Sequence, residues 1–178
     1  VAIVATGAVP HWPSLDLGDS AHVVDAWSVI RDEVRCGSRV VIADWRGDWV
    51  GLGIALKLVR AGHHVRLVTV ANCAGVNVQY TRDPLIAELD RLGVVFTHYA
   101  RFCGADENTA YFVHASGGHA IEMSDTNTVV LCYGHESVMD LAEGLEGWGG
   151  EVHWVGDALT PRTAEEAVLE GLKVGTAI

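Results

Sequence analysis

The chain has 178 residues, of which 49% are hydrophobic and 20 are glycine, enough apolar sequence for one compact domain with a buried core. Its formal net charge of -11 argues against nucleic acid and anionic membranes as partners, because their phosphates attract clustered lysine and arginine. We also expect no membrane-spanning segment, since no apolar run approaches the roughly 18 residues that a span needs.

The cysteines are widely spaced and form neither a C-x-x-C motif nor a cluster with histidine at metal-ligand spacing. This pattern predicts reduced thiols in the core of a cytoplasmic protein, with no metal site in this chain. The residues concerned are Cys36, Cys73, Cys103 and Cys132.

Both ends of the chain have the character of parts of a larger protein. The first residue is not methionine, and the chain starts inside an apolar strand, residues 1–5, that runs into Thr6 and Gly7. The other end, residues 151–178, holds a second apolar strand followed by an aspartate and a helix.

The first half of the interior predicts a βαβ unit, and therefore a parallel sheet. A proline-bearing crossing loop and a short helix come before it. The expected elements are the loop at residues 10–20, the short helix at about 26–34, a buried strand at 39–43, an amphipathic helix at 51–60 closed by Gly62, and a strand at 65–70.

In the second half, Asp83 is expected to cap a helix that begins at Pro84 and ends at Gly93. Residues 94–99 then form a third parallel strand. Between residues 101 and 123 the helix–strand alternation is replaced by short apolar runs separated by turn residues, which predicts an antiparallel meander. A buried strand follows at residues 128–132. The fold class is therefore α/β, a Rossmann-like three-layer parallel sheet with an antiparallel β-meander.

The turn after the first strand of the βαβ unit is the place to look for dinucleotide binding. A G-x-G-x-x-G turn there lets the backbone approach a pyrophosphate, but here alanine stands where the first glycine belongs. The segment from Ala43 to Gly51 is also longer and crowded, and it holds Asp44 and Asp48, which would repel a pyrophosphate, with Arg46 offsetting part of that charge.

The next strand, ending at residues 69–72, lacks the carboxylate or arginine that NAD or NADP sites place on the ribose. Both departures argue against a working NAD(P) site and favour a Rossmann-like unit kept for packing or redirected to another partner. Trp45 and Trp49 would then fill the groove that a cofactor would occupy.

The C-terminal segment is the better candidate for a nucleotide site. Gly156 and Asp157 follow a strand, and the carboxylate can accept hydrogen bonds from ribitol or ribose hydroxyls. Thr163 opens a helix near Ala164, whose free N–H groups and dipole would face a phosphate.

Two alternatives stay open for this segment. Arg162 could pair with a phosphate or with Glu165 or Glu166. The T-x-x-E pattern of Thr163 and Glu166 could simply form a capping box, with Asp157 making a turn.

Three motifs together resemble the C-terminal region of the trimethylamine dehydrogenase and 2,4-dienoyl-CoA reductase class of NADH:flavin oxidoreductases, which is related to Old Yellow Enzyme. They are the A-T-G-x-x-P crossing at residues 5–10, the return crossing at 133–137, and the closing G-D-x-x-x-P-R segment within 155–171. The segment from Ala43 to Trp49 is most similar to the branch that demethylates N-methylated amino acids and betaines.

The resemblance implies a glutathione-reductase-like pair of domains. Residues 1–11 and 151–178 would be remnants of the FAD- or ADP-binding domain, and residues 12–150 an inserted NAD(P)-binding-like Rossmann domain. It also implies an N-terminal barrel, absent from this chain, that carries FMN and a 4Fe-4S cluster and contacts these domains in a homo-oligomeric parent.

Carried onto this chain, the resemblance places Thr6, Gly7, Gly156 and Asp157 at an incomplete FAD or ADP site, and no catalytic residue in the chain. It implies that the parent oxidises a small N-methylated amine and passes electrons to a protein such as electron-transfer flavoprotein. The alternatives are an NAD(P)H-binding domain of a dienoyl-CoA reductase-type enzyme and a non-enzymatic interaction module whose tryptophan-bearing loop docks a partner protein.

Overall fold

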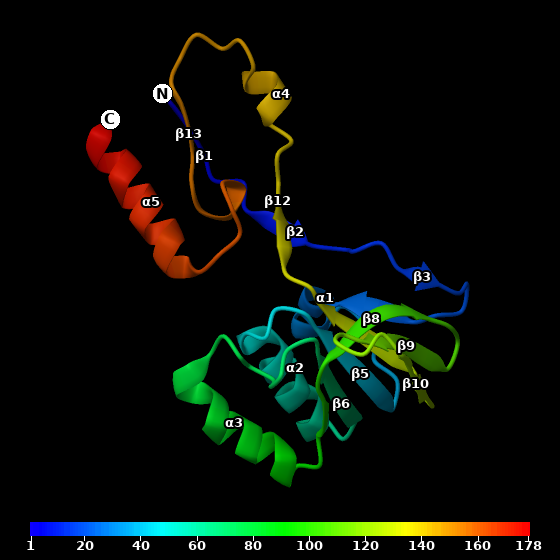
Figure 1. Cartoon of the computed structure of the whole chain (residues 1–178). Helices are drawn as coiled ribbons and strands as arrows, with labels where there is room; N and C mark the ends of the chain where they lie inside the picture. Colours follow the sequence, from blue (N-terminus) through cyan, green and yellow to red (C-terminus); the bar gives the residue numbers. More distant parts are fainter. The chain divides into compact units, whose positions relative to one another are not determined.

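The computed structural model describes the backbone of residues 1–178 and every side chain except that of Gln79. The chain forms two compact units (Figure 1): unit 1 comprises Val1–His11 and Gly134–Ile178, and unit 2 comprises Trp12–Tyr133. Residues 134–150, expected from the sequence in the inserted domain, thus cluster with the terminal segments. The reason is local, because β12 (His135–Ser137) pairs antiparallel with β2 (Ala8–Pro10) directly after the chain leaves unit 2.

Unit 2 is built on a five-stranded parallel sheet whose order is β4-β11-β5-β6-β7. The predicted βαβ unit is present, because α2 connects β5 to its parallel neighbour β6. The strands are β4 (Val23–Asp25), β5 (Arg39–Asp44), β6 (His64–Thr69), β7 (Val95–Thr97) and β11 (Thr128–Cys132), and the helices are α1 (Ala26–Ile30), α2 (Trp49–Arg60) and α3 (Gln79–Arg91).

The parallel sheet is buried on both faces, as strands rich in valine and isoleucine require. Val40 and Ile42 pack with residues of the helices, whereas Val41 and Ala43 pack into a second core with Phe112 and its neighbours. That second core is closed by a four-stranded mixed sheet of order β10-β9-β8-β3, in which β8, β9 and β10 are antiparallel and β3 pairs in parallel with β8. Its strands are β3 (Asp16–Leu17), β8 (Ala100–Ala105), β9 (Thr109–His114) and β10 (Ala120–Ser124). The α/β class, the layers and the meander are confirmed.

Two helix boundaries differ from those expected. The first turn of α3 forms upstream of Asp83, where the N–H groups of Thr81 and Arg82 both donate to the carbonyl of Val78. Pro84 therefore lies inside the helix, and Asp83 forms an ion pair with Arg82 instead of capping it. In α1, the helix ends at Ile30 and Asp32 adopts a left-handed φ of 59°, which stops the helix before residue 34.

Unit 1 holds β1 (Ala2–Val4) paired in parallel with β13 (Val152–Trp154), so the first strand and the closing segment adjoin. After β13 the chain makes a short 3-10 turn and enters the last helix. The remaining elements are α4 (Ala142–Leu145), η1 (Gly156–Ala158) and α5 (Ala164–Ala177).

All four cysteines are free thiols; Cys132 is buried and the others are half-buried. Among the described side chains, no group of three or more His, Cys, Asp or Glu residues could hold a metal ion. In the described part of the chain, no helix has the length and apolar character needed to cross a membrane.

Candidate functional site

A pocket of about 430 Å³ lies within unit 1, where β1, η1 and the start of α5 meet. Most residues expected at the nucleotide site line it. Its walls are Ala5, Gly7, Val155, Gly156, Asp157, Arg162, Thr163, Ala164 and Ala167. Thr6 is not in the lining, because its hydroxyl donates to the carbonyl of Val138 at 2.8 Å and holds the loop between β1 and β2.

Gly156 makes the sharp turn from β13 towards the pocket. Its φ is +62°, a left-handed conformation that favours glycine, and a β-carbon there would stand 3.3 Å from that of Ala167 on α5. Its carbonyl accepts hydrogen bonds from the N–H groups of Leu159 and Thr160, at 2.9 and 3.1 Å, closing the turn that places Asp157 on the pocket wall.

Glu170 on α5 holds this turn in place. One carboxylate oxygen of Glu170 accepts from the Gly156 N–H at 2.7 Å, and the other pairs with the Arg162 guanidinium. Arg162 thus pairs with neither of the acids considered from the sequence. Because Glu170 balances the positive charge of Arg162, this guanidinium would attract a phosphate less strongly.

Glu170 was missed in the sequence because its partners Gly156 and Arg162 lie 14 and 8 residues before it, outside the spacing of neighbours within one helix. The signal that could have revealed it is its spacing from Glu166, since residues four apart share a face of a helix. That face carries Ala167 against Gly156 and Glu170 against Arg162.

The capping box at the start of α5, one of the alternatives left open by the sequence, is present. Thr163 accepts from the N–H of Glu165 at 3.3 Å and its own N–H donates to Glu166 at 3.0 Å, while the two side chains also bond to each other. The Thr163 hydroxyl, with backbone donors, lowers the pKa of the Glu166 carboxyl. The helix terminus therefore already has an anion of its own, which weakens the expectation that its N–H groups face a phosphate.

The remaining polar feature of the pocket is Asp157. Its Oδ1 accepts the Arg162 backbone N–H at a long 3.3 Å, so the carboxylate retains acceptor capacity. A carboxylate beside a glycine turn and small residues fits a polyhydroxyl group such as ribitol or ribose better than a diphosphate. The residues present thus fit the sugar part of FAD or ADP.

The second site considered from the sequence is the turn after β5. There the carboxyl groups of Asp44 and Asp48 bind backbone N–H groups of the turn itself. Asp44 is 2% exposed, and its Oδ1 accepts the Gly47 N–H at 2.9 Å, whereas Oδ2 has no hydrogen-bond partner among the described residues. Burial is the main cause that raises the pKa of Asp44 to about 7.

The start of α2 is closed in a similar way. One carboxylate oxygen of Asp48 accepts a hydrogen bond from the Val50 N–H at 3.0 Å. The other accepts a hydrogen bond from Nε of Arg46 at 3.1 Å. Two backbone donors of the kind that a dinucleotide turn offers to phosphate, the N–H groups of Gly47 and Val50, are thus used internally by Asp44 and Asp48. This geometry supports the expectation that the turn binds no pyrophosphate.

The tryptophans of this turn do not fill a buried groove. Trp45 stacks on Tyr133 with ring centroids 5.8 Å apart, and the Trp45 and Trp49 side chains remain 48% and 60% exposed. At the end of β6, the Thr69 hydroxyl accepts the Ala71 N–H at 3.2 Å and serves its own turn.

No family model matches this sequence. A probable N-methylproline demethylase from Rhizobium meliloti (strain 1021) is 35% identical over 98 residues, which cover 54% of this chain and 14% of that protein. The structure of histamine dehydrogenase from Rhizobium sp. 4-9 superposes with a TM-score of 0.87 at 19% identity, covering 97% of this chain and 29% of that one.

A 2-naphthoyl-CoA reductase gives a TM-score of 0.84 at 20% identity, over 99% of this chain and 26% of the reductase. The chain thus spans less than a third of the length of each of these proteins. The sequence match and the shared fold confirm the resemblance that the motifs indicated. The chain is thus similar in sequence to part of a probable N-methylproline demethylase and shares the fold of part of histamine dehydrogenase and 2-naphthoyl-CoA reductase, as expected from the resemblance to the trimethylamine dehydrogenase and 2,4-dienoyl-CoA reductase class.

Proposed function

We propose that this chain is the nucleotide-binding part of an oxidoreductase that demethylates a small N-methylated amine and passes the electrons to a protein acceptor. The observation that carries this proposal is the relationship to a probable N-methylproline demethylase, at 35% identity. In this proposal the chemistry takes place on FMN in a barrel outside this chain, with an iron-sulfur cluster beside it.

The role of unit 1 in this proposal is to hold FAD or ADP through the pocket around Asp157. Asp157 would accept sugar hydroxyls, Gly7 and Gly156 would let the nucleotide approach the backbone, and the Thr163–Ala164 end of α5 would border it. FAD would supply a redox-active ring, whereas ADP would supply binding energy alone.

The apolar residues on the outside of α5 support the proposal that further parts of the parent, including its barrel, pack against this unit. Val168 is 71% exposed and Leu172 is 61% exposed, and burying such side chains contributes roughly 1.5–3 kcal/mol each.

The hydrogen bonds of the turn after β5 support a protein electron acceptor. Because Asp44 and Asp48 use the N–H groups that would bind a pyrophosphate, an exit of electrons through NAD(P)H is disfavoured. An electron-transfer flavoprotein is the acceptor class we propose for the parent.

The pocket is tested by titrating ADP into the 178-residue chain and following backbone amides by NMR. We expect weak, saturable shifts at Gly7 and Gly156, with affinity reduced about tenfold by Asp157→Asn, since a hydrogen bond to a charged group is worth about 1.5–3 kcal/mol. Asp140→Asn, at an exposed position of the same unit, is the matched control and should bind like the wild type. If Asp157→Asn and Asp140→Asn showed shifts of equal size, Asp157 would not be part of the binding site.

The electron route is tested on the full-length protein encoded by the native gene. With N-methylproline as substrate, we expect turnover to reduce an electron-transfer flavoprotein and to consume neither NADH nor NADPH. Consumption of either nucleotide would favour the alternative, a reductase of the same class.

That alternative has support in the fold, since a 2-naphthoyl-CoA reductase shares it. Titration of NADH followed through the fluorescence of Trp45 and Trp49 separates the two. A saturable change would indicate a working nicotinamide nucleotide site in unit 2.

A further inference from the structure

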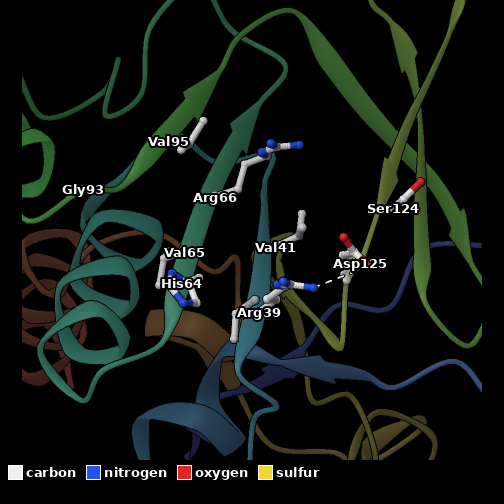
Figure 2. A pocket seen from close by; sticks show the side chains of 11 residues that line it. Arg39, Val41, His64, Val65, Arg66, Gly93, Val95, Ser124 and Asp125 are labelled. Carbon is white, nitrogen blue, oxygen red and sulfur yellow. Dashed lines mark ion pairs between the residues drawn. The ribbon is translucent and has the colours of Figure 1, made fainter.

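Unit 2 has a second pocket, at the opposite end of the sheet from Asp44. It has a volume of about 170 Å³ and opens at the amino ends of β5, β6 and β7, beside the turn that follows β10 (Figure 2). The space is several times that of one water molecule, enough for a small organic ion. Its lining includes Arg39, Val41, His64, Arg66, Val95 and Asp125.

Arg66 is the unusual member of this lining. In the sheet it stands directly between Val41 on β5 and Val95 on β7, so one face carries valine, arginine and valine in a row. Arg66 is half-buried, yet no hydrogen bond or ion pair joins its side chain to another described residue. A guanidinium partly withdrawn from water is unfavourable unless an acceptor faces it.

The other arginine of the pocket already has a partner. Arg39 forms an ion pair with Asp125 at 3.4 Å, drawn as a dashed line in Figure 2, where the Arg66 guanidinium extends separately. The charges of Arg39 and Asp125 therefore balance each other. The Thr126 hydroxyl donates a hydrogen bond to the carbonyl of Met123 at 2.7 Å. The pocket is thus left with the single positive charge of Arg66 as its main unpaired group.

This charge count selects among anions. A phosphate dianion would bring a second negative charge that Arg66 alone does not balance, and it would face Asp125. A monocarboxylate matches one guanidinium in charge and in planar, two-oxygen geometry. Beside Arg66, Val95 is 50% exposed and offers most of the apolar surface for a hydrocarbon tail, since Val41, which also lines the pocket, is only 5% exposed.

We propose that this pocket binds a small monocarboxylate with a short apolar tail, its carboxylate on Arg66 and its tail against Val41 and Val95. The proposal is independent of the nucleotide pocket in unit 1 and of the electron acceptor.

The test is an NMR titration of the 178-residue chain with sodium butyrate at constant ionic strength and pH 8, above the range in which ordinary imidazoles titrate. We expect saturable shifts of the amides of Val41, Arg66 and Val95. Arg66→Gln, which keeps the length of the side chain, should weaken the affinity about tenfold. Arg66→Lys, which keeps the charge but not the forked geometry, should fall between the two.

Two comparisons complete the experiment. Arg91→Gln, at the exposed end of α3, is the charge-matched control and should bind butyrate like the wild type. Sodium phosphate and butylamine should each shift these amides much less than butyrate does. Absence of saturable shifts with butyrate, an equal response of Arg66→Gln and wild type, or tighter binding of phosphate would each overturn the proposal, provided that the remaining spectrum shows the variant to be folded.

Discussion

The carboxyl group of Asp44 lies against the backbone of Gly51, so closely that a β-carbon at position 51 would stand 2.8 Å from Asp44 Cγ. This contact joins the end of β5 to the first turn of α2. In a dinucleotide-binding turn the corresponding space lets a pyrophosphate approach the helix. In this protein the side chain of Asp44 fills that space.

Gly51→Ala should therefore destabilise unit 2 by about 1–3 kcal/mol, because the buried Asp44 has no room to move away. Gly53→Ala is the matched control in the same helix, since a β-carbon there meets nothing within 4 Å. That change should stabilise the protein by up to about 1 kcal/mol through helix propensity. Urea unfolding of both variants measures the difference, and equal effects would mean that Asp44 does not crowd position 51.

The raised pKa of Asp44 predicts a pH dependence of stability. The pKa is about 7 in the folded protein and 3.8 for an aspartate in water, so the folded state holds this proton more tightly than the unfolded chain does. The free energy of unfolding should therefore fall as the pH rises from about 4 to 7, by up to about 4 kcal/mol, and change no further above pH 7 through this group.

Asp44→Asn should remove this dependence, because the amide does not ionise. Denaturant unfolding at pH 5 and at pH 8 should show the stability of the variant relative to the wild type rising between the two pH values, by about 3 kcal/mol. Asp19→Asn, at an exposed position of unit 2, should follow the wild type at both. A constant difference between Asp44→Asn and wild type would show that Asp44 is ionised throughout.

The capping box of α5 should contribute measurably to unit 1. Thr163→Ala removes the acceptor for the Glu165 N–H and should destabilise α5 by about 1 kcal/mol. Thr176→Ala, at the other end of the same helix, removes only a hydroxyl that bonds to the carbonyls of Leu172 and Lys173 and should have a smaller effect. Hydrogen exchange of the first-turn amides of α5 distinguishes the two variants.

Gly156 should tolerate substitution poorly. Alanine at a φ of +62° is strained and would press on Ala167, so Gly156→Ala should cost about 1–2 kcal/mol and speed amide exchange at Leu159 and Thr160. Gly171→Ala, where a β-carbon in α5 meets nothing within 4 Å, should instead slow exchange in the helix. If Gly156→Ala leaves exchange at both amides unchanged, the turn is not held as the structure indicates.

The strands and the class of the fold followed from local patterns. The buried strand at residues 128–132 coincides with β11, and the helix after β5 and the capping box of Thr163 and Glu166 are where the sequence predicts them. Apolar runs and cap residues act within a few positions, which is why they can be recognised without the tertiary structure. The predicted start of α3 at Pro84 was wrong, because the residues before it already form the first turn of the helix.

The pairings across the chain were decided only by the tertiary structure. Glu170 joins Gly156 and Arg162, and Asp44 fills the space against Gly51, because the fold brings separate segments into contact. Arg66 carries no sequence signal at all, and its unpaired position is visible only from the strands on either side of it. Residue type alone determined the main strands and helices of the parallel sheet, but not short elements such as β3, which lies where a loop was expected. Burial and partner choice depend on distances between segments that no local pattern contains.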